Sequence, residues 1–451
     1  MDRVKRYKIH FFLFVIFMAF VFIGPYYFLS YKPQEMTYNR SEKSQQWTGV
    51  ITFWDFPRLD KKTGGQYNWI NEKIRSFERA NPGVYIDFQP LDWEKGAIKL
   101  DAALKLGNLP DIIPVGSNYT IISQDVLEPL DKYFSLDELK DFKEEALRAV
   151  TYNGEILAMP WMMTTYSLIL NLDLFSKRGV EPPLDGYWTY EEFIDKLQQL
   201  TFDSRGRGKI DHYGFNSSVQ AGYYNIWGII LSDGGRVIDD KLDFVFNDEA
   251  AYSGVEKVID MKQKYGVTHP TFGENTSNEA WTTFYRDKNV AVIPAGTWSL
   301  NVLERLRNEG KGFNYAVAHY PTGTLGNPVS MSNTVGSYGI SKQEDPEKLE
   351  VCVAFLKYLI KDEYQNQLNR LGVFPVKKSL GNLYVDDPNM SLIYESLENT
   401  IIIPPHPYWN DIDEILQKEI QQGVLGKKDI KRVMEDGEEK VNSLVNLKGR
   451  Y

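Results

Sequence analysis

The chain has 451 residues, of which 43% are apolar and 25% charged, a balance typical of a globular protein with room for two or three domains. It carries 61 acidic and 51 basic residues, and the net charge of −10 argues against a general nucleic-acid binder, since phosphates need a positive partner. The single cysteine, Cys352, excludes an internal disulfide framework and a multi-thiolate metal site. Aromatic residues make up 14% of the chain, an excess that needs an explanation.

The N-terminus carries an apolar run from Ile9 to Leu29, preceded by four basic residues. A helix of about 20 apolar residues spans the hydrocarbon core of a bilayer. Basic residues before such a helix keep its N-terminal end in the cytoplasm. The run has neither a cysteine to lipidate nor a small-residue cleavage site. We therefore predict a transmembrane signal anchor over residues 1–31 and a polar linker over residues 32–48, with a cleaved signal peptide as the alternative.

The part that follows opens with alternating strand and helix signals. β-Branched and aromatic runs predict strands over residues 50–56, 84–88 and 111–115, and apolar spacing predicts helices over residues 67–79 and 97–106. This βαβαβ order is typical of a parallel sheet covered by helices.

Later segments continue the alternation without a clear linker. Capping boxes predict helix starts at Ser135 and Thr189, and an amphipathic pattern predicts a helix over residues 346–360 with Cys352 in the core. Further strands are expected over residues 290–293 and 315–318. Two α/β lobes, with the chain crossing between them, explain this order.

No catalytic motif stands out. The sequence lacks a Walker A loop, a His-Glu-x-x-His helix and a Gly-x-Ser-x-Gly elbow, and its five histidines are scattered. We therefore expect no cofactor, no metal and no enzymatic activity.

Several short segments together resemble the extracellular solute-binding proteins of ABC importers, in the sugar-binding branch similar to maltose-binding protein. They occur in the family's order and spacing, and the most informative are residues 51–54, 77–83, 107–113, 152–160, 294–298 and 336–340. The resemblance implies two lobes, each a mostly parallel sheet flanked by helices, with a ligand cleft between them. It places lobe 1 at residues 49–160 and about 319–371, and lobe 2 at residues 161–318 and about 372–451.

A sugar presents flat C–H faces and a rim of hydroxyls, which suit aromatic rings and short polar groups. The aromatic excess agrees with such a ligand, although most aromatics must be core. The resemblance, with the positions after strands, gives the expected site residues Asp55, Asn118, Trp161, Thr164, Tyr224, Trp298, Tyr338 and Trp409.

Each of these residues also has an ordinary structural role open to it. Asp55 could cap the following loop, and the aromatic residues, Trp161 and Tyr338 among them, could be packing. Thr164 and Val115 stand where maltose binders carry a carboxylate and a stacking Trp, which argues for a different sugar.

The resulting prediction is an extracytoplasmic, membrane-tethered and monomeric binding component of a sugar importer. Its partners are a neutral mono- or oligosaccharide and the permease subunits, because no cluster of Arg or Lys falls in the expected cleft loops. Two other functions stay open: a tethered sugar sensor working with a signalling kinase, since an anchor replaces the usual lipid-modified Cys, and a carbohydrate-active enzyme.

Overall fold

The computed structural model describes residues 47–448, apart from residues 117, 184, 240, 334, 404 and 405. The predicted anchor (residues 1–31) and nearly all of the predicted linker (residues 32–48) lie outside the described residues. Within the described ranges, no helix is both long and apolar enough to cross a membrane.

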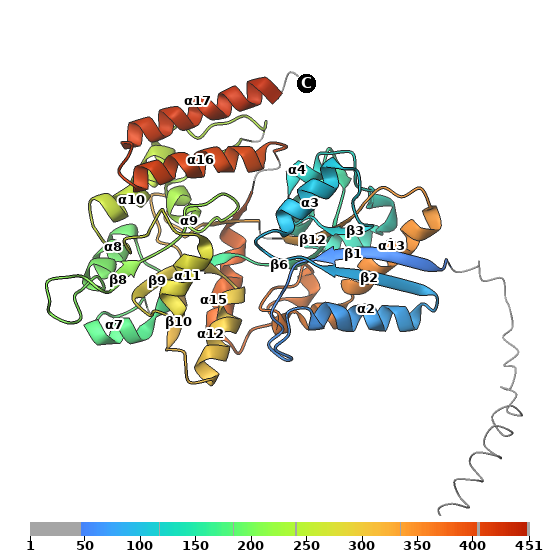
Figure 1. Ribbon diagram of the computed structural model, residues 1–451, viewed down its shortest axis with the longest axis horizontal. Coiled ribbons are helices and arrows are strands. Elements are labelled where there is room, and N and C mark those ends of the chain that lie inside the picture. Colours follow the sequence, from blue (N-terminus) through green and yellow to red (C-terminus); the bar gives the residue numbers. More distant parts are fainter. Residues whose placement is uncertain are drawn as a thin grey trace, which may run out of the picture. The chain divides into compact units, whose positions relative to one another are not determined.

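Lobe 1 is built on a five-stranded sheet with the order β2-β1-β3-β12-β6. Its strands are β1 (Gly49–Asp55), β2 (Val84–Pro90), β3 (Ile112–Pro114), β6 (Met159–Met163) and β12 (Val335–Ile340). Strand β1 is parallel to β2 and β3, so the predicted βαβαβ opening is confirmed. Because right-handed crossovers to opposite sides of β1 put their helices on opposite faces, α2 (Asn68–Ala80) and α3 (Gly96–Lys105) lie on either side of this sheet in Figure 1.

Lobe 2 is built on a four-stranded sheet with the order β10-β7-β9-β8. Its strands are β7 (Tyr166–Asn171), β8 (Tyr213–Phe215), β9 (Val290–Gly296) and β10 (Tyr315–Ala318). Two short pairs complete the strands, β4 (Thr151–Tyr152) with β5 (Glu155–Ile156) and β11 (Ser330–Ser332) with β13 (Thr400–Ile402).

Each sheet contains one strand that runs against the others, and all remaining strands run in the same direction, as expected for mostly parallel sheets. In lobe 1, β12 is antiparallel to β3 and to β6, and in lobe 2, β7 is antiparallel to β9 and to β10. Strands β6 and β7 are separated by only two residues and belong to different sheets. The reversed strands are β12 in lobe 1 and β7 in lobe 2, and each comes after the chain has crossed from the other sheet. The two-lobed α/β class itself is confirmed.

Helices cover the outer faces of both sheets. Besides α2 and α3, lobe 1 carries α4 (Tyr119–Ile122), α5 (Leu136–Asp141), α6 (Glu144–Arg148), α13 (Pro346–Leu359) and α14 (Asp362–Gln365). Lobe 2 carries α7 (Leu172–Arg178), α8 (Tyr190–Gln199), α9 (Trp227–Ile230), α10 (Glu249–Gln263), α11 (Ser277–Tyr285), α12 (Trp298–Asn308), α15 (Pro388–Ser396), α16 (Trp409–Val424) and α17 (Ile430–Lys448). Short 3₁₀ turns lie at Asp131–Tyr133, Leu231–Asp233, Leu368–Arg370, Lys378–Leu380 and Leu397–Asn399.

The helix starts predicted from capping boxes in the sequence are confirmed in the structure. The capping boxes at Ser135 and Thr189 both form and begin α5 and α8. Cys352 is fully buried in α13, as predicted. At the first described residue, the Trp47 indole N–H donates to Asp345 Oδ2 over 2.9 Å, and Asp345 Oδ1 caps α13. The start of the described chain is therefore held against this helix.

The chain passes between the two sheets at three places within its described ranges: between β6 and β7, between β10 and β12, and between α14 and α15. Thr165 and Ser330 lie on the first two of these crossings, Thr400 begins β13, which pairs with β11, and all three residues are buried. Their hydroxyl oxygens lie 2.8 to 3.0 Å apart. The segments that carry these three residues are therefore joined at one point by a small hydroxyl cluster.

Candidate functional site

An ion pair stands where β1 ends. Both carboxylate oxygens of Asp55 accept hydrogen bonds from Arg58 Nη1, over 3.0 and 2.8 Å, and Oδ2 also accepts one from the Tyr338 hydroxyl over 2.7 Å. Asp55 is 2% exposed. Because its oxygens are already engaged, Asp55 acts here chiefly to hold Arg58 and Tyr338.

The Arg58 guanidinium is only partly used by the protein. It lies 4.8 Å from the centre of the Trp161 ring, and Nη1 also donates to the carbonyl of Phe56 over 3.1 Å. Burial is the largest single influence on the pKa of Arg58 and lowers it, but the charge and hydrogen bond of Asp55, with Tyr338 and Tyr67, together outweigh burial, so the pKa is raised and the group stays charged. In the described part of the chain, Nε and Nη2 make no hydrogen bond, which leaves them able to donate to a bound molecule.

A small pocket opens beside this pair, and three of its eight lining residues are aromatic. Trp161 is 1% exposed and lies between Trp69 and Tyr338, with ring centres 5.4 and 5.5 Å away and nearly parallel planes. The indole N–H groups of Trp69 and Trp161 are buried and have no hydrogen-bond partner among the described residues. The pocket is lined by Asp55, Phe56, Arg58, Gln66, Trp69, Ile70, Trp161 and Leu371.

On lobe 2, Trp298 keeps much of its ring open to solvent. It is the first residue of α12, it is 47% exposed, and its ring meets Trp281 edge-on with centres 5.1 Å apart. The hydroxyls of Thr164 and Thr297 lie 2.8 Å apart, which ties the first interlobe crossing to the start of the same helix. Lobe 2 thus offers an exposed indole with hydroxyls close to it in the chain and in space.

Tyr224 and Trp409 are paired with each other inside lobe 2. They are 4% and 1% exposed, and the Trp409 indole N–H donates to the Tyr224 hydroxyl over 3.0 Å. Burial raises the pKa of Tyr224 well above its usual value, with a further contribution from Asp413. The structure places both rings in the core of lobe 2, where their polar atoms satisfy each other.

Asn118 lies where the lobes touch. Its side chain caps α4 by accepting from the backbone N–H of Thr120, and it also accepts from Asn410 Nδ2 of lobe 2 over 3.3 Å. Thr120 adds a bond to the carbonyl of Pro407 over 3.3 Å. A second interlobe contact is made by Asn301 of α12, whose amide donates to the carbonyl of Arg370 over 3.4 Å.

The eight expected residues therefore form groups rather than one cluster. Asp55, Trp161 and Tyr338 meet at the lobe 1 pocket, and Thr164 and Trp298 lie at the start of α12. The buried pair Tyr224 and Trp409 and the interlobe contact of Asn118 are separate from both.

The sequence prediction did not include two residues that the structure makes notable: Arg58, which lines the lobe 1 pocket, and Trp93, which stacks on the pocket residue Phe56. Arg58 follows Asp55 by three residues, a spacing that could have revealed the ion pair. Trp93 lies between two acidic residues, Asp92 and Glu94, in a loop where a core tryptophan is unusual, and it is 60% exposed.

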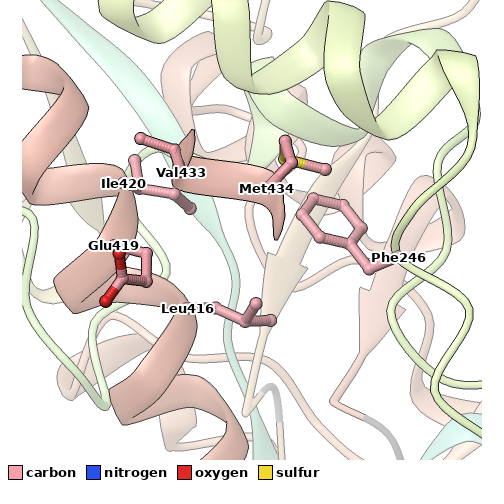
Figure 2. Close-up of a pocket in the computed structure, with 6 residues that line it drawn as sticks. All are labelled: Phe246, Leu416, Glu419, Ile420, Val433 and Met434. Atoms are coloured by element: carbon pink, nitrogen blue, oxygen red, sulfur yellow. The ribbon is translucent and has the colours of Figure 1, made fainter. Parts of the chain in front are cut away.

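A second small pocket lies between α16 and α17 and has a different character (Figure 2). It is lined by Phe246, Leu416, Glu419, Ile420, Val433 and Met434. In Figure 2 the Glu419 carboxylate points away from Phe246, and it pairs with Lys428 and Lys440. Apart from Glu419, the pocket is lined by apolar side chains, so we interpret it as a packing gap between helices.

Comparison with known proteins places this arrangement in a family. Residues 72–391 match the family described as bacterial extracellular solute-binding protein. A putative binding protein of Brucella abortus is 23% identical over 387 residues, covering 84% of this chain and 90% of that protein. The sn-glycerol-3-phosphate-binding periplasmic protein of Escherichia coli is 21% identical over 428 residues, covering 88% and 92%.

Solved structures agree with this assignment at the level of the fold. The ABC substrate-binding protein of Listeria monocytogenes in complex with cycloalternan superposes with a TM-score of 0.73 at 18% identity, covering 89% of this chain and 100% of that one. The resemblance read from the sequence motifs is thereby confirmed. The chain belongs to the bacterial extracellular solute-binding protein family.

Proposed function

We propose that this protein is the carbohydrate-binding component of an ABC importer, and that it binds its ligand without transforming it. The observation that carries the proposal is the lobe 1 pocket. An arginine whose Nε and Nη2 make no hydrogen bond to the described residues lies there beside stacked aromatic rings. A saccharide needs an apolar surface for its C–H faces and fixed donors for its hydroxyls, and this pocket supplies both.

The charge balance of the pocket favours a neutral ligand. Arg58 is the cation that lines it, and Asp55 lies 2.8 Å away and neutralises it. A phosphate or carboxylate would find the positive charge of Arg58 already balanced by the Asp55 carboxylate and would be repelled by that carboxylate. Sugar hydroxyls can instead accept from Nε and Nη2 while the ion pair stays intact.

The proposal extends to how the protein works. Ligand binding draws the lobes together, and the closed form delivers the sugar to the permease subunits. We further propose that the protein acts as a monomer outside the cytoplasm, and that residues 9–29 anchor it in the membrane, because this run has the length and polarity of a membrane span.

Thermal-shift and calorimetric measurements test the ligand class. The panel contains maltotriose, cyclic and linear oligosaccharides, a uronate and sn-glycerol 3-phosphate. We expect neutral saccharides to raise the melting temperature. We expect Arg58→Met to weaken their binding at least tenfold. The matched control is Arg205→Met, whose side chain is 67% exposed in a lobe 2 loop and should leave binding unchanged. Tight binding of only the phosphate or the uronate would refute the neutral-sugar proposal.

The anchor is tested separately by mass spectrometry of protein extracted from membranes. The proposal requires a mature chain that retains its N-terminal segment. A new N-terminus near Ser30 or Gln34 would show that the segment is a cleaved signal peptide.

A further inference from the structure

An exposed tryptophan lies flat on a second aromatic ring at the carboxyl edge of the lobe 1 sheet. Trp93 is 60% exposed, and its ring is stacked on Phe56 with centres 4.4 Å apart and planes 12° from parallel. Phe56 covers one face of the Trp93 indole, while much of the rest of the indole is exposed to water. The exposed indole face is a flat apolar surface on which the C–H face of a ligand could stack.

The pair is held in place by the loops that carry it. Phe56 directly follows β1, and Trp93 lies between β2 and α3, so both come from the edge at which parallel strands end. The Asp92 carboxylate accepts from the backbone N–H groups of Glu94 and Lys95 over 2.9 and 2.7 Å, which fixes the turn around Trp93. A Cβ on Gly96 would lie 2.6 Å from the Phe56 ring, so glycine at the start of α3 makes room for that ring. The platform is therefore organised before any ligand arrives.

Two observations place the platform on the side of lobe 1 that faces lobe 2. Phe56 lines the same pocket as Arg58 and Trp161. Glu94, next to Trp93, lies within electrostatic reach of Tyr223 in lobe 2: burial is the main cause of the raised pKa of Tyr223, and the Glu94 charge adds to it. In the sheet, β2 is the edge strand furthest from β6, so Trp93 lies away from the interlobe crossing that follows β6.

We propose that Trp93 and Phe56 form a second saccharide subsite, outward of the Arg58 pocket, and that the ligand is consequently an oligosaccharide and not a monosaccharide. This inference rests on the proposed function. A pyranose ring would cover the open indole face with its C–H groups. Its hydroxyls would lie near the exposed side chains of Glu94 and Lys95, which can accept and donate hydrogen bonds.

The test compares the binding of saccharide series of increasing length to the full-length protein. The probes are α-1,4-glucans, β-1,4-glucans and β-1,4-xylans of two to five units, with glucose and xylose as monosaccharides. Binding constants are measured by calorimetry for the wild type, Trp93→Ala and Trp93→Phe. The matched control is Tyr85→Ala, because Tyr85 is a 63% exposed aromatic residue on β2, the strand that precedes the Trp93 loop.

In the wild type we expect affinity to rise about tenfold when a bound series is extended by the unit that reaches Trp93. Trp93→Ala should abolish that step and leave shorter ligands unaffected. Trp93→Phe should keep part of the step, and Tyr85→Ala all of it. Melting temperatures should change little, because Trp93 is largely exposed.

Two results would overturn the inference while the proposed function stands: affinity independent of length in the wild type, or a length step that survives in Trp93→Ala. An equal loss for monosaccharides and oligosaccharides in Trp93→Ala would also overturn it, because it would place Trp93 in the first subsite. If no saccharide of any length binds the wild type, the proposed function itself fails, and this inference falls with it.

Discussion

The hydroxyl oxygens of Thr165 and Thr400 lie 2.8 Å apart, although the residues are separated by 235 positions in the chain. Ser330 completes the cluster, at 2.9 Å from Thr165 and 3.0 Å from Thr400. Thr400 also donates to the carbonyl of Ser396 over 2.7 Å. Three hydroxyl protons therefore serve four short contacts, so the cluster depends on how its protons are shared. It also depends on the segments that carry Thr165, Ser330 and Thr400 keeping their positions relative to one another.

We expect Thr165→Val to lower the free energy of unfolding by about 1 kcal/mol, because a buried hydrogen bond is lost while the side-chain volume is kept. Urea denaturation measures this. The double variant Thr165→Val/Thr400→Val should lose less than the sum of the single losses, since the two residues share one interaction. Thr282→Val, whose hydroxyl bonds only a carbonyl of its own helix, should cost less. Strict additivity would contradict a coupled cluster.

Trp298 and Trp409 should respond to truncation in opposite ways. Trp298 is 47% exposed, so Trp298→Ala should leave the melting temperature nearly normal and weaken saccharide binding about thirtyfold, the equivalent of about 2 kcal/mol. Calorimetry and thermal unfolding on the same preparation measure both. A large loss of melting temperature with affinity retained would show that Trp298 is a packing residue.

Trp409 is 1% exposed and bonded to Tyr224, so Trp409→Ala should lower the free energy of unfolding by about 3–5 kcal/mol. Affinity in the folded fraction should change much less than in Trp298→Ala. The opposite outcome, stable protein with lost binding, would return Trp409 to the ligand-contact residues.

Asp413 should make stability depend on pH in the acid range. It is 1% exposed and accepts from the Gly222 N–H over 2.6 Å and from Gln417 Nε2 over 3.0 Å, and burial raises its pKa to about 6. Between about pH 4 and 6 the folded state thus retains a proton that the unfolded state has lost. Folding is favoured by this group below that range, and the contribution disappears as the pH rises through 6.

Urea denaturation at pH 4, 5, 6 and 7, for the wild type and Asp413→Asn, isolates this contribution because the amide does not titrate. The stability of the wild type relative to the variant should fall with rising pH, by at most about 1.4 kcal/mol per unit. A difference that is flat, or that grows with pH, would contradict the raised pKa.

Cys352 should be chemically silent in the native protein. It is fully buried, and burial raises the pKa of its thiol to about 12, with a further rise from Asp111. Since the thiolate is the reactive species, a chromogenic disulfide reagent at pH 8 should find no accessible thiol until denaturant is added. Fast reaction of the native protein would mean that α13 opens readily.

Much of lobe 1 could be predicted because its signals are local. The βαβαβ opening reads directly from β-branched runs and helical spacing, and the boxes at Ser135 and Thr189 mark helix starts within four residues. The direction of β12 could not be read in this way. It pairs with β3 and β6, which lie far from it in the chain. The residues of a single strand do not indicate whether its neighbours run parallel or antiparallel to it.

The site was harder to predict, because burial is not a local property. Trp298 and Trp409 both begin a helix, yet one is exposed and the other is enclosed by Tyr224 and the core of lobe 2. The sequence prediction missed Arg58 because it considered only clusters of basic residues near Asp55, although the three-residue spacing between the two is compatible with an ion pair. Trp93 was overlooked because its stacking partner, Phe56, comes from a different loop.

The hydrogen bond between Trp47 and Asp345 affects how the protein resists a pulling force applied to its N-terminal end. A pull on the chain ahead of residue 47 meets this hydrogen bond first and then strand β1, which lies between β2 and β3 and pairs with β2 along its whole length. Tension along β1 loads these backbone hydrogen bonds in shear, so they must break together and not one at a time. The loops that carry Arg58 and Trp93 follow the far ends of β1 and β2. A pulling force on the N-terminal segment would therefore have to break the hydrogen bonds of β1 before it could displace the loops that carry Arg58 and Trp93.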